Sequence, residues 1–181
     1  MNLKQMFLAQ LEREAVATRR TLEQVPEGRN DWKPHEKSMT LGYLSGLVAS
    51  MPGWAEFMIE RDELDLSHPS AEPFKAKVFE NRIGLLKTLD DGLIKSRKAL
   101  ERTTDERLER PWRFVMGGRI LFDAPRYVAL NESLFCHMAQ HRGQLTVYLR
   151  LNEATVPGIY GPSADEHQSA RLLADWATKR R

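Results

Sequence analysis

The sequence predicts an all-α protein, a four-helix bundle with a short irregular or hairpin segment before the last bundle helix. Three observations support this class. Apolar residues recur at helical spacing through most of the chain, and clusters of Pro and Gly separate these stretches. Only residues 110–125 are rich in aromatic and β-branched side chains. Four long helices joined by modest loops favour a bundle, and 181 residues are expected to form a single domain, residues 1–181.

The first half of the chain is expected to hold two helices. The first should run over residues 2–24 and end before the break at residues 26–28. The second should begin near Ser38 or Thr40, since either side chain can cap a helix. Pro52 should kink or break it. Its apolar face comprises Leu44, Leu47, Met51, Trp54, Ala55 and Met58.

The second half is expected to hold two more long helices. After a loop at residues 65–70, a third helix is predicted over 73–102. A hairpin or ordered loop around Gly117 and Gly118 follows. The fourth helix should begin at Pro125, which suits a first turn, and end at Leu151 or Asn152.

A short final helix is predicted beyond the rigid turn at residues 157–162. Ser163 and Glu166 have the spacing of a capping box at its start. The last residues, 178–181, are expected to be frayed.

The composition predicts a soluble protein with neither a nucleic-acid nor a membrane partner. The net charge is +2, from 27 basic and 25 acidic side chains, which is too balanced for a polyanionic surface. No apolar run approaches the roughly 20 residues of a membrane helix, and the N-terminus lacks the pattern of a signal peptide. Cys136 is the single cysteine, so no intrachain disulfide can form. The cytoplasm is the expected compartment.

The most informative segment holds two histidines, His137 and His141, four residues apart in the fourth helix. That spacing is about one helical turn, so both rings should leave the same face. A helical wheel places them on an apolar stripe, within an arc of roughly 80°. The stripe comprises Leu130, Leu134, His137, His141, Leu145 and Tyr148. The pair could be hydrogen-bonded core histidines or two ligands of one metal ion.

Three segments, residues 32–44, 137–149 and 157–166, resemble the DinB/YfiT-like family of bacterial four-helix-bundle proteins. The resemblance spans nearly the whole chain. It implies a divalent metal, zinc or nickel, held by three histidines. Two of these match His137 and His141, and the third is expected on the second helix in a Leu-x-x-His segment. That segment here is Leu44-Ser45-Gly46-Leu47, so Leu47 occupies the ligand position. Leucine cannot bind a metal.

The sequence is therefore compatible with three functions. The first is a DinB-like protein of unassigned activity, in which a small molecule binds in the bundle pocket and the metal site is degenerate. The second is a divalent-metal-dependent enzyme, for which the resemblance implies thiol-dependent S-transfer. The third is a non-catalytic stress-response or structural protein, and the resemblance also implies a homodimer.

Other side chains favour structural roles at this level. The four tryptophans could line a pocket but are more often core or interface residues. Arg142 is expected in a surface ion pair, and Cys136 as inert packing between apolar neighbours. The capping of the final helix accounts for Asp165 and Glu166.

Overall fold

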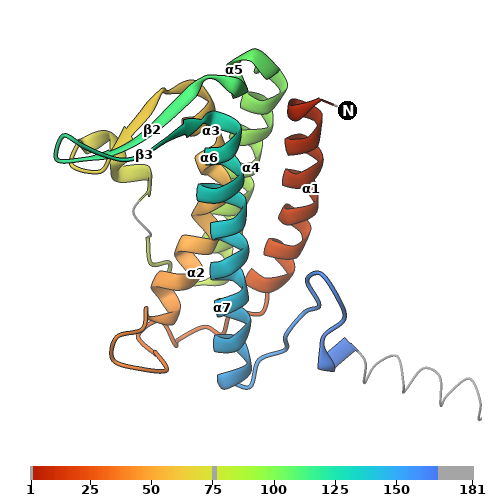
Figure 1. The fold of residues 1–181 in the computed structure, drawn as a ribbon. Helices are drawn as coiled ribbons and strands as arrows, with labels where there is room; N and C mark the ends of the chain where they lie inside the picture. Colours follow the sequence, from red (N-terminus) through yellow and green to blue (C-terminus); the bar gives the residue numbers. More distant parts are fainter. Residues whose placement is uncertain (1, 75–76, 167–181) are drawn as a thin grey trace, which may run out of the picture.

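In the computed structural model, which describes residues 2–74 and 77–166, long helices lie side by side and a small sheet covers one end of them (Figure 1). The sheet has the order β1-β2-β3, with β1 (Glu63–Asp65) parallel to β2 (Pro111–Met116). Strand β3 (Arg119–Pro125) is antiparallel to β2. The all-α class expected from the sequence is therefore only partly correct, because it omits this sheet. A strand as short as β1, in which only Leu64 is buried, leaves no periodic signal in the sequence.

The predicted hairpin is confirmed as β2 and β3. Its turn is formed by Gly117 and Gly118, whose φ angles are +57° and +77°. Positive φ at both central positions is the requirement of the tight hairpin turn whose twist matches the strands, and glycine adopts it without strain.

The first two predicted helices are confirmed, with the expected interruption. Helix α1 (Leu3–Leu22) begins after Asn2, whose side chain accepts a hydrogen bond from the backbone of Gln5. Helix α2 (Leu41–Ser50) is capped by the Thr40 side chain. A 3₁₀ turn, η1 (Met51–Gly53), then contains Pro52 and leads into α3 (Trp54–Glu60). Proline removes a backbone donor, which explains the change of helix type there.

The third helix is shorter than predicted. Residues expected to begin it form a 3₁₀ segment, η2 (Pro69–Phe74), and α4 covers only Arg82–Arg102. The Asn81 side chain accepts from the backbone of Gly84 and so caps α4 at that point. Before α4, Lys77 and Val78 lie close to Gly46 and Gly42 of α2. The carbonyl of Phe79 accepts a hydrogen bond from the Asn30 side chain, in the loop that precedes α2. A short helix, α5 (Asp105–Glu109), then leads into β2.

The last long helix has the predicted ends but an unpredicted middle. It comprises α6 (Arg126–Ala129), the π-helical segment η3 (Leu130–Cys136) and α7 (His137–Leu151). A π-helical turn holds more residues than an α-helical turn, so it shifts the phase of the side chains that precede it. Such segments occur frequently at functional sites. Residues 164–166 begin the predicted final helix; its remainder and the expected frayed end, residues 178–181, lie outside the described residues.

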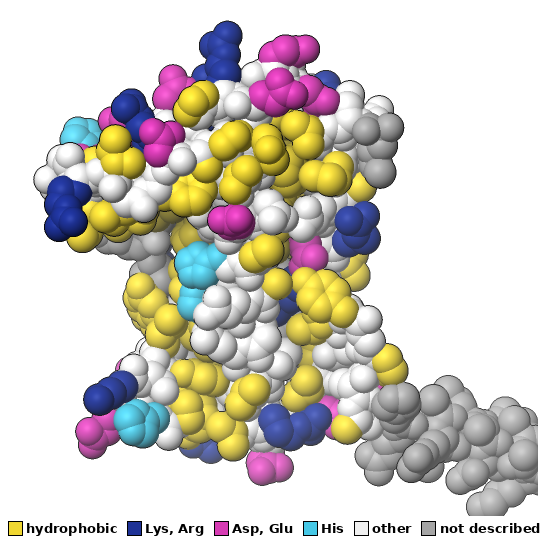
Figure 2. Space-filling view, in the orientation of Figure 1, with side chains coloured by type: hydrophobic (Ala, Val, Ile, Leu, Met, Phe, Trp, Pro, Cys, Tyr) yellow, Lys and Arg dark blue, Asp and Glu magenta, His cyan; other side chains and the backbone are white. Residues whose placement is uncertain are grey.

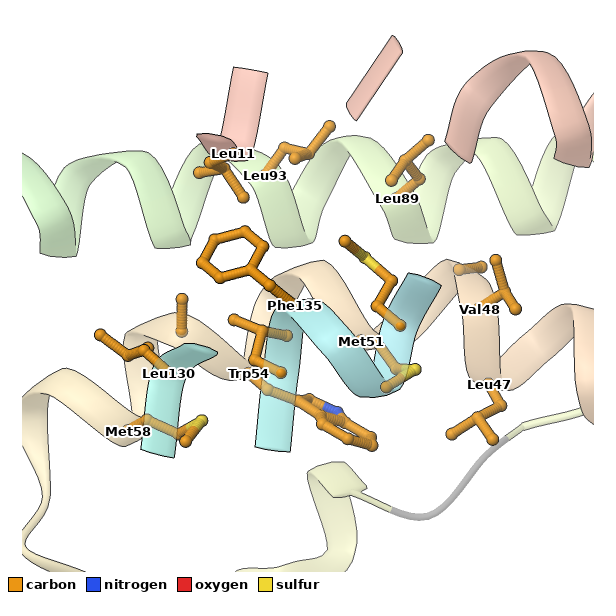
Figure 3. Packing of buried hydrophobic residues seen from close by; sticks show 14 of the residues in the cluster. Leu11, Leu47, Val48, Met51, Trp54, Met58, Leu89, Leu93, Leu130 and Phe135 are labelled. Carbon is orange, nitrogen blue, oxygen red and sulfur yellow. The ribbon is translucent and has the colours of Figure 1, made fainter. Parts of the chain in front are cut away.

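The main hydrophobic core lies between α4 and the other long helices. Figure 3 shows the Phe135 ring directed toward Leu93 of α4, whereas Trp54 and Leu47 point away from α4. In the described part of the chain, no helix combines the length and apolar character needed to cross a membrane.

Two glycines allow α4 to approach the turn η1 closely. A Cβ atom built on Gly92 would lie 3.0 Å from both the Cα and the N of Gly53. We expect Gly92→Ala to lower the free energy of unfolding by about 1–3 kcal/mol, because a backbone contact cannot move aside as a side chain can. The matched control is Gly143→Ala in α7, where the new Cβ would meet nothing within 4 Å. That variant should be stabilised by up to about 1 kcal/mol through helix propensity, and urea denaturation of both would check the pair.

Candidate functional site

A cavity of about 490 Å³ lies between the sheet, α3 and the π-helical segment. We call it the aromatic cavity. Figure 2 shows a hollow under the hydrophobic sheet end of the molecule, with histidine at its edge. The lining residues are Trp54, Met58, Leu64, Leu66, Phe74, Trp112, Phe114, Glu132, Ser133, Cys136, His137 and Gln140.

Each wall of the aromatic cavity comes from a different element. Trp54 from α3 and Phe74 from η2 form one aromatic pair, with ring centroids 5.0 Å apart. Trp112 and Phe114 from β2 form a second pair, stacked at 6.4 Å. The remaining wall is polar and is supplied by η3 and the start of α7. Two of the four tryptophans thus line a pocket while also being buried; Trp176 lies outside the described residues.

His137 and His141 are close together at the edge of this cavity. Their Nε2 atoms are 2.8 Å apart, which is a hydrogen-bond distance. His141 is 6% exposed and its Nδ1 lies 2.8 Å from the Gln144 side-chain amide. The His137 ring also hydrogen-bonds the backbone of Ser133. Because Nε2 of His137 faces His141, that bond is donated by Nδ1.

These contacts allow two arrangements of protons. If the Gln144 carbonyl oxygen faces His141, Nδ1 of His141 carries the proton, and both Nε2 lone pairs point at each other. A proton or a metal ion must then lie between them. If the amide is turned so that its nitrogen donates to Nδ1, His141 donates from Nε2 to His137, and both rings are satisfied while neutral. The neutral arrangement needs no metal.

Burial and the adjacent His141 charge lower the pKa of His137 below its ordinary value of 6.5. The folded protein therefore takes up a proton at His137 only at a lower pH than the unfolded chain does. Stability is fully present above about pH 6.5 and is lost as the pH falls from there toward the folded pKa.

We accordingly expect the free energy of unfolding to decrease between pH 7.5 and pH 5.5. His137→Gln should show a smaller decrease over the same interval. The carboxyl groups whose pKa is lowered by arginine partners, such as Glu12, contribute only below their ordinary range near 4.5 and do not affect this window. Urea titrations at the two pH values would test this, and an equal decrease in both proteins would contradict it.

Leu47, the residue at the position where the resemblance implies a third ligand, is buried in the structure. Leu47 is 6% exposed and lies on α2. Two contacts with the last helix are made on either side of it in the sequence, one by α3 and one by the loop before α2. Trp54 contacts His137 at 6.1 Å between ring centroids, and the Tyr148 hydroxyl donates to the Met39 carbonyl. Leu47 lies between these two contacts in the sequence, and that it faces His137 and His141 stays a prediction.

The histidine pair supplies two of the three ligands that the resemblance implies. Zinc ligands at about 2.0–2.1 Å in tetrahedral geometry hold their nitrogens roughly 3.3 Å apart, so the two rings would also have to separate slightly. Among the described residues, no group of three or more His, Cys, Asp or Glu side chains is arranged to bind a metal. His35 and His68 are exposed in turns, and His167 lies outside the described range. The donor set therefore does not fit a tightly held metal ion.

Two sequence-based expectations about neighbouring residues are wrong. Cys136 is not packed inertly between apolar residues; it is exposed and lines the aromatic cavity. Arg142 is not in a surface ion pair. It is completely buried, and its guanidinium group donates to Glu14, Thr18 and Tyr160. No single-residue signal in the sequence distinguished these positions from ordinary helix surface.

The carboxylates near the final helix do more than cap it. The Ser163 side chain accepts from the backbone of Glu166, as a helix cap does. The Glu166 carboxylate, however, accepts from the backbone of Gly158 and pairs with Arg20 of α1. Asp165 pairs with Arg150. These contacts fasten the chain after α7 to the helices.

Helices side by side with a three-stranded sheet at one end define a helix-rich α+β class. Within it, the fold is that of DinB-like proteins. A DinB-like protein of Bacillus subtilis (YjoA) superposes with a TM-score of 0.61 at 21% identity, over 85% of this chain and 96% of that one. A DinB-like protein of Bacillus cereus gives 0.65 at 21% identity, over 85% and 95%. The resemblance is thus confirmed for the fold. No family model and no curated protein sequence matches the chain.

Proposed function

We propose that the chain binds a small molecule in the aromatic cavity, and that His137 and His141 act there as a hydrogen-bonded pair. In this proposal the packed helices are the four-helix bundle that the sequence predicts, with a metal site that has lost its third ligand. The observation that carries it is the cavity itself. About 490 Å³ is the size of small-molecule sites, and an apolar lining with a few convergent polar groups is their usual composition.

The polar wall gives the histidine pair access to a bound molecule. His137 lines the aromatic cavity, whereas His141 is buried behind it and holds its ring in place. Both nitrogens of the His137 ring are engaged, Nε2 with His141 and Nδ1 with the Ser133 backbone, so a ligand that uses Nε2 as an acceptor must displace the contact with His141. Gln144 and the Ser133 backbone fix the opposite ring nitrogens, so the pair is oriented before any ligand arrives.

Two kinds of side chain can report binding: the tryptophans by their fluorescence and the cysteine by its reactivity. A neutral apolar dye should bind with a change in the fluorescence of Trp54 and Trp112. It should also protect Cys136 from alkylation by a maleimide, which mass spectrometry reads without ambiguity because the chain has one cysteine. Cys136→Phe should weaken dye binding by filling the cavity. Val147→Phe, on an exposed part of α7, should not. Equal dye binding by both variants would refute the cavity as the site.

A metal-dependent enzyme is the second candidate, because both Nε2 atoms converge on one point. In that case a bound molecule would have to supply the donor that Leu47 does not. Elemental analysis of untagged protein after incubation with zinc, nickel or manganese separates the two candidates. Stoichiometric metal in the parent protein would favour the enzyme, and only traces would favour the metal-free pair.

A further inference from the structure

The formal charge in the wall of the aromatic cavity is negative. Glu132, in η3, is the one carboxylate among the described lining residues, and none of them is Lys or Arg. The Glu132 carboxylate makes no ion pair with any residue in the described ranges 2–74 and 77–166. It is therefore free to interact with a ligand.

The aromatic walls present ring surface to a bound molecule. The indole nitrogens of Trp54 and Trp112 are buried from solvent and have no hydrogen-bond partner among the described residues. The planes of Trp54 and Phe74 are tilted by 38° and those of Trp112 and Phe114 by 15°, on two different walls. Ring faces carry partial negative charge and attract cations, especially where water is excluded.

The histidine in the wall does not reverse this charge. The His137 ring lies with its Nε2 against Nε2 of His141 and, unlike a lysine or arginine side chain, carries no fixed charge. The nearest arginine of α7, Arg142, is buried in its own pair with Glu14 and does not line the cavity. The described wall thus combines π surface and one carboxylate without a compensating cation.

We infer that the aromatic cavity binds an organic cation, a small apolar molecule that carries a quaternary or tertiary ammonium group. The inference rests on the proposed small-molecule function and names the ligand class. The apolar body of the ligand would lie against Met58 and Leu64, and its ammonium group between the aromatic walls and Glu132. An anionic ligand of the same size would be repelled by the carboxylate and the ring faces.

Three molecules of nearly equal shape test this inference on the full-length protein. They are phenyltrimethylammonium, its uncharged isostere tert-butylbenzene, and the anion benzenesulfonate. Binding is followed by the fluorescence of Trp54 and Trp112. We expect the cation to bind at least about 10-fold more tightly than the isostere, and the anion to bind most weakly. A quaternary ammonium does not titrate, so the order should not change between pH 6.5 and pH 8.

Glu132→Gln provides the specific test, because it keeps the shape of an exposed side chain and removes its charge. It should weaken cation binding by about 3–10-fold and leave binding of tert-butylbenzene unchanged. The matched control is Glu36→Gln, which removes the same charge from an exposed loop at the opposite end of the helices.

The outcomes separate this inference from the proposed function. If tert-butylbenzene binds as tightly as the cation, the cavity binds small molecules but the cation assignment is wrong. A preference for the cation that Glu132→Gln leaves intact would also overturn the assignment as stated. If neither of these molecules nor the neutral dye binds, both proposals fail.

Discussion

Replacing Arg142 with methionine should lower the free energy of unfolding by about 3–5 kcal/mol, the largest stability effect expected in this protein. Arg142 has no exposed surface and its guanidinium Nη2 lies 2.6 Å from the Glu14 carboxylate, itself 9% exposed. The same guanidinium donates to the Thr18 hydroxyl at 3.0 Å and the Tyr160 hydroxyl at 2.7 Å. Without it, a carboxylate would remain buried beside two hydroxyl groups with no cation.

A double-mutant cycle tests whether the effect comes from the uncompensated charge. Glu14→Leu together with Arg142→Met removes both charges, so this variant should be more stable than Arg142→Met alone. Arg97→Met is the control, because Arg97 and Glu12 are paired at comparable distance but with 38% and 51% of their side chains exposed. That variant should lose less than about 1 kcal/mol. If both single variants lose the same amount in urea denaturation, burial is not the cause.

The contacts of Arg142 also show why the sequence predicted that one face of the last helix is buried but missed a second buried face. The wheel correctly grouped His141, Leu145 and Tyr148, which are buried on one side. It assigned Arg142 to the surface because arginine is rarely buried. Yet α7 contacts both α2 and α1, so a second face about 100° away is buried as well. The partner that makes this tolerable, Glu14, is 128 residues distant in sequence and cannot be inferred from helical spacing.

Local signals predicted the Thr40 cap of α2, the hairpin and the interruption at Pro52, because each depends on a few adjacent residues. The cavity could not be predicted in the same way. Its walls come from α3, η2, β2 and η3, and its polar side depends on a π-helical segment. A wheel drawn at a constant 100° per residue carries no information about such a segment. Cys136, at the end of η3, was misassigned for this reason.

The gain of a metal site is the other large effect expected, and it tests the placement of Leu47 directly. Leu47→His should give a protein that binds zinc or nickel in one equivalent, through the new imidazole together with His137 and His141. Three histidine ligands and an open position form a common catalytic zinc site. Without metal, a histidine at this buried position should destabilise the protein by about 1–3 kcal/mol, since its ring would lack a partner.

Added metal should reverse that loss. At a free concentration about 100 times the dissociation constant, the variant should gain about 2.7 kcal/mol, whereas the parent should gain little. Leu47→Asn is the matched control for polarity, and Leu47→His combined with His141→Gln removes one ligand; neither should be stabilised by metal. Thermal unfolding with and without zinc measures all four proteins. If Leu47→His binds no more metal than the parent, then Leu47 does not face the pair. In that case the role of the two histidines would be limited to the hydrogen bond between them.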